Sequence, residues 1–319
     1  MPDWNDVFNE IQLRRAQIAA QAGALNAQAQ TVVDVVRREC LAKLFDYTQR
    51  NVIAYYSGWL SKPDIEQVEI GDEDKNGFMM AVHRLDRSKG LDLILHTPGG
   101  SIAATQSIAD YLHQMFGMNI RAIVPQIAMS AGTMLACSCR SIVMSKHSNL
   151  GPIDPHLRGV PAHGVIKEFK RACSEVRRDR SKAQVWGFII GQYSPTFLSQ
   201  CQNAIDWSES FVKEQLAAVM FAGRRDAKRK AAQIVRKLAD YTDNKTHSRH
   251  IHTDECKKLG LRIEQLEDDA TLQDLVLTVH HCFMHSLMNT PSFKMIENHL
   301  GTAFVKQQAM VQVVQPGKA

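Results

Sequence analysis

The sequence predicts an α/β fold with a largely parallel sheet, preceded by a helical N-terminal arm and followed by a helical C-terminal part. Two kinds of pattern predict it. Apolar runs such as LDLILHT and IRAIVPQIA are nearly continuous, as expected of parallel strands that are covered on both faces. Helical patterns separate these runs at short spacing, which is the arrangement of βαβ units.

The expected elements follow in chain order. Residues 5–50 are rich in Ala, Gln and Arg, lack proline and show helical spacing, so they predict one or two amphipathic helices. NVIAYYSGW, from Asn51, is rich in β-branched and aromatic residues and predicts the first strand. In DEDKNGFMMAVHRLD we expect a turn at Asn76-Gly77 and then a helical run. The next expected elements are a strand in GLDLILHT, a helix in SIAATQSIADYLHQMF, a strand in IRAIVPQIA, a helix from AGTMLACSC and a short strand in SIVMS.

The second half of the chain is mostly helical from about residue 167 onward. A short extended piece in RHIHTDE precedes a helix, and LGLRIEQL holds the last expected strand. We therefore expect three parts: an N-terminal helical arm over residues 1–50, a central α/β domain over residues 51–270, and a C-terminal helical extension over residues 271–319.

Composition limits the classes of function. Hydrophobic residues make up 45% of the chain and charged residues 22%, as in ordinary soluble globular proteins. The net charge of +5 is too low to indicate nucleic-acid binding without a concentrated basic patch. The densest basic stretch, GRRDAKRKAAQIVRK from Gly223, has helical spacing and indicates a solvated helix face. Binding of an acidic partner or a membrane surface is its alternative interpretation.

The cysteines and histidines do not form a metal-site motif. The seven cysteines are scattered without a CxxC motif, which favours reduced thiols in a cytosol, and Cys137 and Cys139 are expected to be core thiols. His281 and His285 have helical metal-ligand spacing but no partner carboxylate, so a packed helix is favoured. No apolar run approaches the roughly 18 residues of a membrane span, and the N-terminus does not resemble a signal peptide. We expect a cytoplasmic protein without metal, cofactor or membrane span.

Ser130 lies where a buried strand turns into a helix. Small residues follow it in AMSAG, so the chain can turn sharply there. A serine at a helix N-terminus is close to free N–H groups that favour a developing anion, as a nucleophile requires. A plain helix N-cap is the alternative interpretation.

Gly99 and Gly100 end the neighbouring strand in HTPGG. Glycine can turn its N–H outward at backbone angles that other residues avoid, so the pair predicts an oxyanion-binding loop, with an ordinary tight turn as the alternative. The carboxyl ends of parallel strands share one edge of a sheet, where ligands collect. Both junctions are expected at this edge, and together they favour the catalytic interpretation.

Several blocks in order resemble one protein family. HTPGG, AMSAGTMLA and SNLGPIDPH are similar to the ClpP/SppA branch of the ClpP–crotonase superfamily, and RNVIAYYSGWL, DEDKNGFMMAVHRLD and MIENHLG extend the similarity to the serine dehydrogenase proteinase (SDH-type) family over about residues 30–305. The resemblance implies a right-handed spiral of ββα units, self-association and a nucleophile at Ser130. It also implies that the N–H groups of Gly100 and Ala131 hold the oxyanion, with Gly99 shaping the loop.

The general base is not fixed by this pattern. In ClpP-like chains a histidine follows the serine by about 25 residues, but that position here is Pro155, between Asp154 and His156. Asp154 is expected to orient an imidazole or shape the pocket, and a turn-capping role is its alternative. His156 fills the histidine position only after a shift of one residue.

Two further candidates come from the same resemblance. SppA-like proteases use a lysine about 40 residues after the serine, a zone that here holds Lys167, Lys170 and His163. The segment HIHTDECKKLGL resembles the ClpP block that follows the third catalytic residue, which places His247 beside the active centre. We rank His247 first, His156 second and Lys167 third, with a solvated loop histidine as the alternative for His247.

These residues predict a serine peptidase of the ClpP/SppA type. Ser130 would attack a peptide carbonyl and form an acyl-enzyme, and the substrate would be a peptide or protein. No Walker A motif is present, so the chain itself would act without ATP, as a homo-oligomer. The alternatives are a non-catalytic scaffold or peptide-binding module and, less favoured, a crotonase-like acyl-CoA enzyme, which needs no nucleophile at the position of Ser130.

Overall fold

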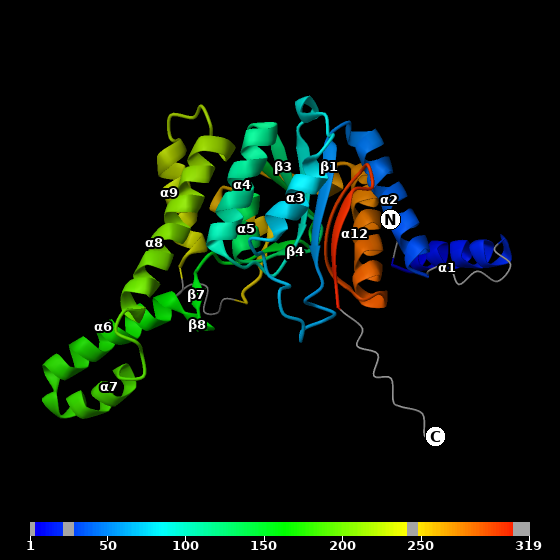
Figure 1. The fold of residues 1–319 in the computed structure, drawn as a ribbon. Helices are drawn as coiled ribbons and strands as arrows, with labels where there is room; N and C mark the ends of the chain where they lie inside the picture. Colours follow the sequence, from blue (N-terminus) through cyan, green and yellow to red (C-terminus); the bar gives the residue numbers. More distant parts are fainter. Residues whose placement is uncertain (1–3, 22–28, 241–247, 309–319) are drawn as a thin grey trace, which may run out of the picture.

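A seven-stranded sheet forms the centre of the molecule (Figure 1). The structure is a computed structural model that describes residues 4–21, 29–240 and 248–308. The strands of all its sheets are β1 (Asn51–Ser57), β2 (Leu91–His96), β3 (Ile120–Val124), β4 (Ile127–Ala128), β5 (Ser141–Met144), β6 (Asn149–Leu150), β7 (His156–Leu157), β8 (Val160–Pro161), β9 (Ile251–His252), β10 (Ile263–Gln265), β11 (Ser292–Asn298) and β12 (Ala303–Gln307).

Helices surround this sheet. The α-helices are α1 (Trp4–Gln21), α2 (Ala29–Thr48), α3 (Asp74–Val82), α4 (Ile102–Phe116), α5 (Ala131–Cys137), α6 (Ala162–Arg178), α7 (Ala183–Ile190), α8 (Phe197–Gln215), α9 (Ala227–Leu238), α11 (Thr253–Leu259) and α12 (Ala270–Asn289). The short helices are η1 (Arg87–Lys89), η2 (Arg180–Lys182), η3 (Leu216–Met220) and η4 (Leu266–Asp268). The α/β class predicted from the sequence is confirmed.

The strand order of the large sheet is β10-β5-β3-β2-β1-β11-β12. β10, β5, β3, β2 and β1 run parallel, whereas β11 is antiparallel to β1 and β12 is antiparallel to β11. The prediction of a helical extension over 271–319 was therefore incomplete, because α12 is followed by two strands that extend the sheet. β11 contains charged residues, so it did not show the continuous apolar run by which the other strands were predicted.

Helices cover both faces of the sheet, as the continuous apolar strands require. Alternate side chains of each strand point to opposite faces. In β1, Ile53 and Tyr55 belong to the core beneath α3, α4 and α5, whereas Val52, Ala54 and Tyr56 belong to the core beneath α1, α2 and α12. The predicted N-terminal helices thus pack on the face opposite α5.

A second, three-stranded sheet, β4-β6-β9, lies next to the first. The apolar run IRAIVPQIA forms both β3 and β4, because the chain bends at Pro125 and Gln126. β3 belongs to the large sheet and β4 to the small sheet, and α5 follows directly. β3, β4 and α5 thus form one ββα unit of the kind that the family resemblance implied.

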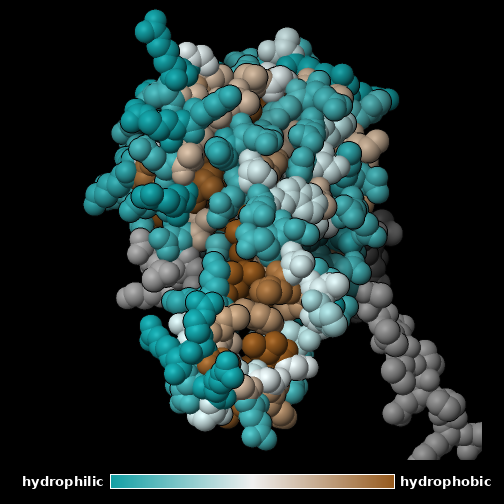
Figure 2. All heavy atoms as spheres, turned by 90° about the vertical axis from the view of Figure 1, so that its left-hand side faces the viewer, coloured by the Kyte–Doolittle hydropathy of each residue, from teal (hydrophilic) through white to brown (hydrophobic). Residues whose placement is uncertain are grey.

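α6 and α7 form an arm that projects from the body, joined to it by α8 (Figure 1). The arm has its own small core of Ala162, Val165, Phe197, Cys201 and Ile205. Figure 2 shows apolar atoms gathered in a hollow on this side of the molecule. Among the residues described by the structure, no helix is long and apolar enough to cross a membrane.

The predicted turn at Asn76-Gly77 was wrong, because both residues lie inside α3. Gly77 is needed there for packing rather than for a turn. A β-carbon on Gly77 would stand 2.5 Å from Ile296 Cδ1 and 2.9 Å from Phe304 Cδ1, so glycine lets α3 lie close against β11 and β12.

Candidate active site

Ser130 occupies a strained turn between β4 and α5. Its φ is 50° and its ψ is −117°, in a region that side chains other than glycine rarely adopt. A sharp strand-to-helix turn of this kind exposes a nucleophile at the end of a sheet. The side chain makes no capping hydrogen bond to the helix, so the N-cap alternative does not account for its presence.

Main-chain hydrogen bonds join this turn to the end of β2. The N–H of Met129 donates to the carbonyl of Thr97 at 3.0 Å, and the N–H of Thr97 donates to the carbonyl of Ile127 at 3.3 Å. Within the turn, the N–H of Gly132 donates to the carbonyl of Met129 at 2.7 Å. The two strand-to-helix junctions that the sequence indicated are therefore neighbours in the structure.

Gly99 lies against Ser130. Its φ is 101°, and a β-carbon there would stand 2.7 Å from Ser130 Cβ and 3.0 Å from the Ala131 nitrogen. Both the backbone conformation and the contact exclude a larger residue. The glycine loop therefore approaches the first turn of α5 at the serine itself.

Gly100 pairs with Ile70, a contact for which the sequence gave no signal. The N–H of Ile70 donates to the carbonyl of Gly99 at 2.7 Å, and the N–H of Ser101 donates to the carbonyl of Ile70 at 2.9 Å. In such a parallel bridge the N–H of Gly100 itself points away from Ile70. Ala131 is the first residue of α5, so its N–H has no acceptor within the helix. These are the two donors expected for an oxyanion.

A cavity of about 340 Å³ lies beside the turn. Pro98 and Met129, the neighbours of Gly99 and Ser130 in the chain, form part of its wall. The other lining residues are Trp59, Leu60, Gln126, Ile127, Asn149, Ser248 and His250. An apolar cavity with a few polar groups next to a strained serine is suited to hold a substrate side chain.

Asp154 is 1% exposed, in a segment tied to the serine helix. The N–H of Gly151 donates to Thr133 Oγ1 at 2.9 Å, and Thr133 Oγ1 donates to the carbonyl of Ala128 at 2.8 Å. Thr133 thus connects the GPIDP segment to the end of β4, a role that sequence reasoning missed, because a threonine in an apolar helix gives no distinct signal.

The candidate bases lie in different places. His156 lies in β7 and pairs with Pro161, and it is partly buried. Lys167, with His163 and Lys170, lies on α6 and lines a cavity of about 1400 Å³ between α6, α8 and α9. Ser130 is not among the described residues of that lining. His247 lies outside the described residues.

The structure does describe the residues that precede and follow the stretch 241–247. Ser248, the next residue, lines the cavity beside Pro98 and Met129. On the other side, the carbonyl of Leu238 accepts a hydrogen bond from the N–H of Ile153 at 3.1 Å, next to Asp154.

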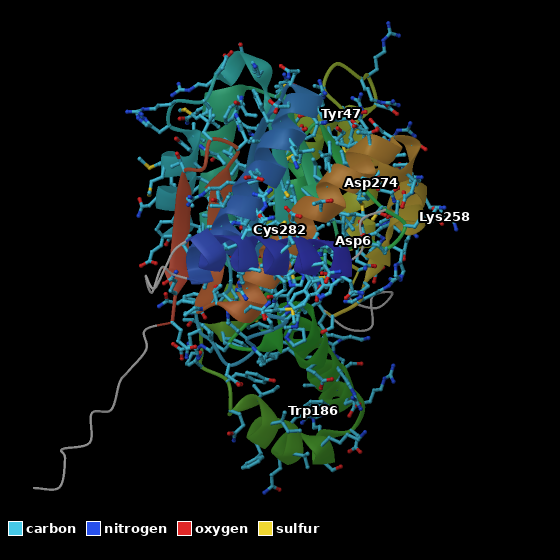
Figure 3. All side chains as sticks on the ribbon, turned by 90° about the vertical axis from the view of Figure 1, so that its right-hand side faces the viewer. Asp6, Tyr47, Trp186, Lys258, Asp274 and Cys282 are labelled. Carbon is cyan, nitrogen blue, oxygen red and sulfur yellow. The ribbon has the colours of Figure 1, made fainter. Side chains whose placement is uncertain are left out.

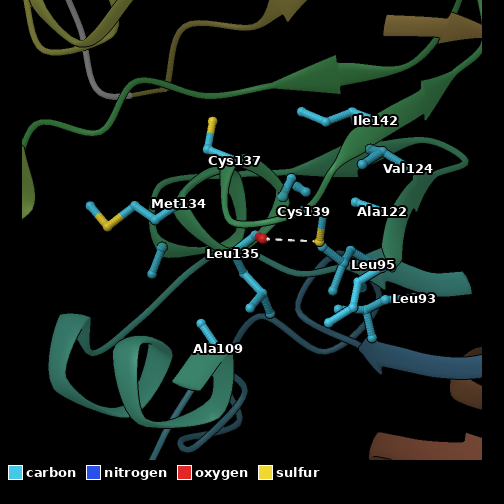
Figure 4. Close-up of a cluster of buried hydrophobic side chains, with 14 of the residues drawn as sticks. Leu93, Leu95, Ala109, Ala122, Val124, Met134, Leu135, Cys137, Cys139 and Ile142 are labelled. Carbon is cyan, nitrogen blue, oxygen red and sulfur yellow. Dashed lines mark hydrogen bonds between the residues drawn. The ribbon is translucent and has the colours of Figure 1, made fainter. Parts of the chain in front are cut away.

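The cysteines near α5 are core thiols, as predicted. Cys137 and Cys139 are buried, and burial raises the pKa of both, that of Cys139 to about 12. Cys139 Sγ donates to the carbonyl of Leu135 at 3.4 Å, the bond dashed in Figure 4, where apolar side chains of β2, β3 and α4 surround the pair. Neither thiol has the character of a nucleophile.

His96 precedes the glycine loop and is fully buried. Neither ring nitrogen has a hydrogen-bond partner within the described chain, and burial lowers the pKa of His96 to about 3. Its ring packs against Trp59 at 4.5 Å and Tyr56 at 5.4 Å between ring centres. His96 is thus neutral and belongs to the core rather than to the proton transfers of the site.

The chain is similar in sequence to a known protein family. The model of a family described as ClpP-like SDH-type serine proteinase matches residues 26–296. The chain belongs to this family. Its similarity to a ClpP-like serine proteinase extends from α2 to β11, and the strained Ser130 and the paired glycines both lie within the matched range.

Two relatives from Methanocaldococcus jannaschii are similar in sequence. The uncharacterized protein MJ0137 is 26% identical over 263 residues, which cover 81% of this chain and 76% of the relative. The uncharacterized protein MJ1495 is 28% identical over 191 residues, covering 60% of this chain and 58% of the relative. A solved structure, a mutant of the 1510-N membrane-bound stomatin-specific protease, aligns with 66% of this chain and 79% of its own, at 16% identity and a TM-score of 0.38.

Proposed function

We propose that this SDH-type family member is a serine peptidase that hydrolyses peptide bonds through an acyl-enzyme on Ser130, without an ATPase of its own. The observation that carries the proposal is the contact of Gly99 with Ser130 at the strained turn. Membership in the family supports a serine protease. The substrate would be a peptide or a protein.

The first step is attack of Ser130 Oγ on the peptide carbonyl. Negative charge develops on the carbonyl oxygen, and the N–H groups of Gly100 and Ala131 are proposed to receive it, helped by the N-terminal end of α5. A base takes the serine proton and returns it to the leaving amine. Water then attacks the acyl group. The base takes a proton from this water and returns it to Ser130 Oγ as the acyl group leaves.

We assign the base to His247, oriented by Asp154, with His156 and Lys167 as the alternatives. Support comes from described residues before and after the stretch 241–247. Ser248 lines the cavity beside Met129, and the carbonyl of Leu238 accepts a hydrogen bond from the N–H of Ile153, the residue before Asp154. Lys167 is the weakest alternative, because the described lining of its cavity includes neither Pro98 nor Met129, which form part of the wall of the cavity beside the serine turn.

The substrate backbone is proposed to lie along the free edge of the glycine loop. Ile70 already occupies one side of Gly100, so an extended peptide would pair on the other side, where the Gly100 N–H points. One substrate side chain would then enter the cavity walled by Pro98 and Met129.

The chain is also proposed to work as a cytoplasmic homo-oligomer. Large apolar side chains are exposed on α7, with Phe188 at 75% and Val185 at 63% of their full exposure. An arm that presents such side chains is suited to contact a second copy.

A fluorophosphonate probe tests the nucleophile. We expect it to label the native chain and not Ser130→Ala. Ser101→Ala is the matched control, because Ser101 also begins a helix but caps it, accepting from the Ala104 N–H at 3.2 Å. The control should label normally. A folded native chain that is not labelled would favour the scaffold alternative, and thioester turnover that survives Ser130→Ala would favour the acyl-CoA alternative.

The same probe separates the candidate bases. Labelling should fall most in His247→Ala and should remain in His156→Ala and Lys167→Ala. Each variant is compared by circular dichroism, so that loss of labelling is attributed to chemistry only where the fold is intact.

A further inference from the structure

Cys40 and Cys282 meet in the helical layer on the sheet face opposite α5. Cys40 lies on α2 and Cys282 on α12, and Cys282 Sγ donates to Cys40 Sγ at 3.6 Å. Both side chains are buried, at 8% and 0% exposure. The two residues are 242 positions apart in the chain, so their contact joins its N-terminal and C-terminal parts. Nothing in the proposed peptidase mechanism uses them.

A cavity of about 170 Å³ opens beside the two sulfurs. Figure 3 looks onto this side and shows α1 lying across α2, with Cys282 and Asp6 labelled. A water molecule takes about 30 Å³ in the liquid, so the cavity has room for a small polar oxidant. Its wall is formed by Cys40 and Cys282 together with Asp6, Val7, Glu10, Arg14, Val36, Glu39, Lys43 and Thr278.

The surroundings give the two sulfurs different roles. The hydrogen bond from Cys282, together with the charges of Lys43 and Arg14, lowers the pKa of Cys40 in spite of its burial. The same hydrogen bond, together with burial, raises the pKa of Cys282 well above its ordinary value. A lowered pKa favours the thiolate, the reactive form of cysteine, so we take Cys40 as the attacking sulfur.

The other buried thiols differ from this pair. Burial raises the pKa of Cys137, Cys139, Cys201 and Cys256. Cys173 is exposed, but it is not hydrogen-bonded to a second thiol in the described chain. Two buried thiols in contact, one of them with a lowered pKa, beside a cavity that charged side chains help to line, are the arrangement of a redox-responsive site.

We propose that Cys40 and Cys282 form a redox-modification site, at which hydrogen peroxide converts the two thiols into a disulfide. Cys40 sulfur attacks one peroxide oxygen, so that an S–O bond forms and the O–O bond breaks. The hydroxide released takes up the proton of Cys40 and leaves as water. Cys282 sulfur then attacks Cys40 sulfur: the S–S bond forms, the S–O bond breaks, and the second water leaves with the proton of Cys282. Two thiols lose two electrons and the peroxide gains them.

The two sulfurs are already in contact before this step. To form the disulfide they must approach from 3.6 Å to about 2.05 Å, which requires rotation of the two side chains and movement of α2 against α12. The product joins two helices that are distant in sequence, and a bridge across a long loop stabilises a fold. We therefore expect the oxidised protein to melt several degrees above the reduced protein.

The test uses the full chain carrying Cys173→Ser, which removes the exposed thiol. After treatment with hydrogen peroxide and alkylation under denaturing conditions, mass spectrometry should show two fewer alkylated cysteines and a peptide pair linked through Cys40 and Cys282. Dithiothreitol should reverse the change. In Cys282→Ser the link cannot form, and dimedone should trap a sulfenic acid on Cys40. Cys201→Ser, a buried cysteine of the arm core, is the matched control and should form the link normally.

The proposal is overturned if the folded chain keeps both thiols while Cys137 or Cys139 is oxidised first, or if the linked peptides contain another pair. The mass-spectrometric search for linked peptides uses the Cys173→Ser chain, in which Cys40 and Cys282 are unchanged. It therefore tests the proposed disulfide even if a variant at either position fails to fold. The result is also independent of labelling at Ser130.

Discussion

Gly99 and Ser130 are packed so closely that no side chain fits between them. A β-carbon on Gly99 would stand 2.7 Å from the β-carbon of Ser130 and 2.7 Å from the carbonyl oxygen of Met129. Both residues have positive φ, 101° at Gly99 and 50° at Ser130. The strained serine and the glycine loop are therefore one structural unit, and a change in the loop must act on the serine.

Replacing Gly99 by alanine should disable the site and also destabilise the protein, because Gly99 has a φ of 101° and no room for a β-carbon. The new methyl group must displace Ser130 or the Ala131 N–H, which would misplace the nucleophile and one oxyanion donor. Loss of one such donor costs on the order of 100-fold in rate. We expect fluorophosphonate labelling of Gly99→Ala to slow by at least that factor.

Gly117→Ala is the control for this prediction. Gly117 also has a positive φ, 60°, but a β-carbon there would meet no atom within 4 Å. With a ψ of −146°, Gly117 lies outside the left-handed helical region, so that variant should lose about 1–3 kcal/mol of unfolding free energy through backbone strain and keep its labelling rate. Equal labelling rates in both variants would show that the contact with Ser130 has no part in reactivity.

Thr133→Val should loosen the link between the serine helix and the GPIDP segment. The hydroxyl of Thr133 accepts from the Gly151 N–H and donates to the carbonyl of Ala128. Valine leaves the buried Gly151 N–H without its acceptor, which costs about 1–3 kcal/mol of unfolding free energy. Because Asp154 lies three residues further on, we expect kcat to fall more than KM changes, measured on a peptide substrate.

Thr278→Val is the matched control. The hydroxyl of Thr278 donates to the carbonyl of Asp274 within its own helix, so valine there removes no bond between elements. Unfolding in urea and peptide hydrolysis should both stay near those of the native chain. If Thr133→Val behaved in the same way, the link through Thr133 would not position the site.

Acid should destabilise the protein through its buried histidines. Burial lowers the pKa of His96 to about 3 and, with neighbouring imidazoles, that of His280 well below its ordinary value. The unfolded chain binds protons below its histidine pKa of about 6.5, and the folded chain does not. The stabilising contribution is therefore complete above pH 6.5 and is lost as the pH falls below it, by about 1.4 kcal/mol per pH unit for each histidine.

His96→Phe checks this sign. Phenylalanine keeps the packing against Trp59 and Tyr56 but cannot be protonated in either state. The free energy of unfolding, measured in urea between pH 7 and pH 5, should fall less steeply with pH than in the native chain. The difference in slope should correspond to one proton fewer taken up on unfolding. His83→Gln, at an exposed position, should keep the native slope. Parallel slopes for the native chain and His96→Phe would contradict the assignment.

Much of the site could be predicted because glycine and serine at strand-to-helix junctions have few explanations. The contact between the junctions depends on parallel strand ends meeting at one edge, which the pattern of strands predicts. Ile70 could not be found in this way, because its bridge to Gly100 joins segments whose pairing has no sequence signature. Thr133 was missed for a similar reason: its role depends on where Gly151 lies in space.

Of the two C-terminal strands, β11 was missed because its charges are buried in pairs. SFKMIEN in β11 contains Lys294 and Glu297, and every residue of that strand is buried. Lys294 Nζ lies 3.0 Å from each carboxylate oxygen of Asp74, and Arg37 Nε lies 2.5 Å from Glu297 Oε2. A pattern that counts charged residues as exposed cannot predict such a strand, since the partners come from α2 and α3.

Lys294→Met should therefore destabilise the protein strongly, even though it makes β11 more apolar. The carboxylate of Asp74, which is 0% exposed, would lose its cation and keep only the hydrogen bonds from Tyr55 Oη at 2.9 Å and the Gly71 N–H at 3.0 Å. Breaking a buried ion pair on one side costs about 3–5 kcal/mol, whereas replacing both partners by apolar residues is often close to neutral. We expect Asp74→Asn in the Lys294→Met background to restore part of the loss, measured by urea unfolding, because asparagine carries no charge and its side-chain oxygen still accepts from Tyr55 Oη and the Gly71 N–H. If the double variant were no more stable than Lys294→Met, the charge left on Asp74 would not be the source of the loss, which would then come from the other contacts of Lys294: the packing of its stem in β11 and the hydrogen bond from its Nζ to the carbonyl of Glu69.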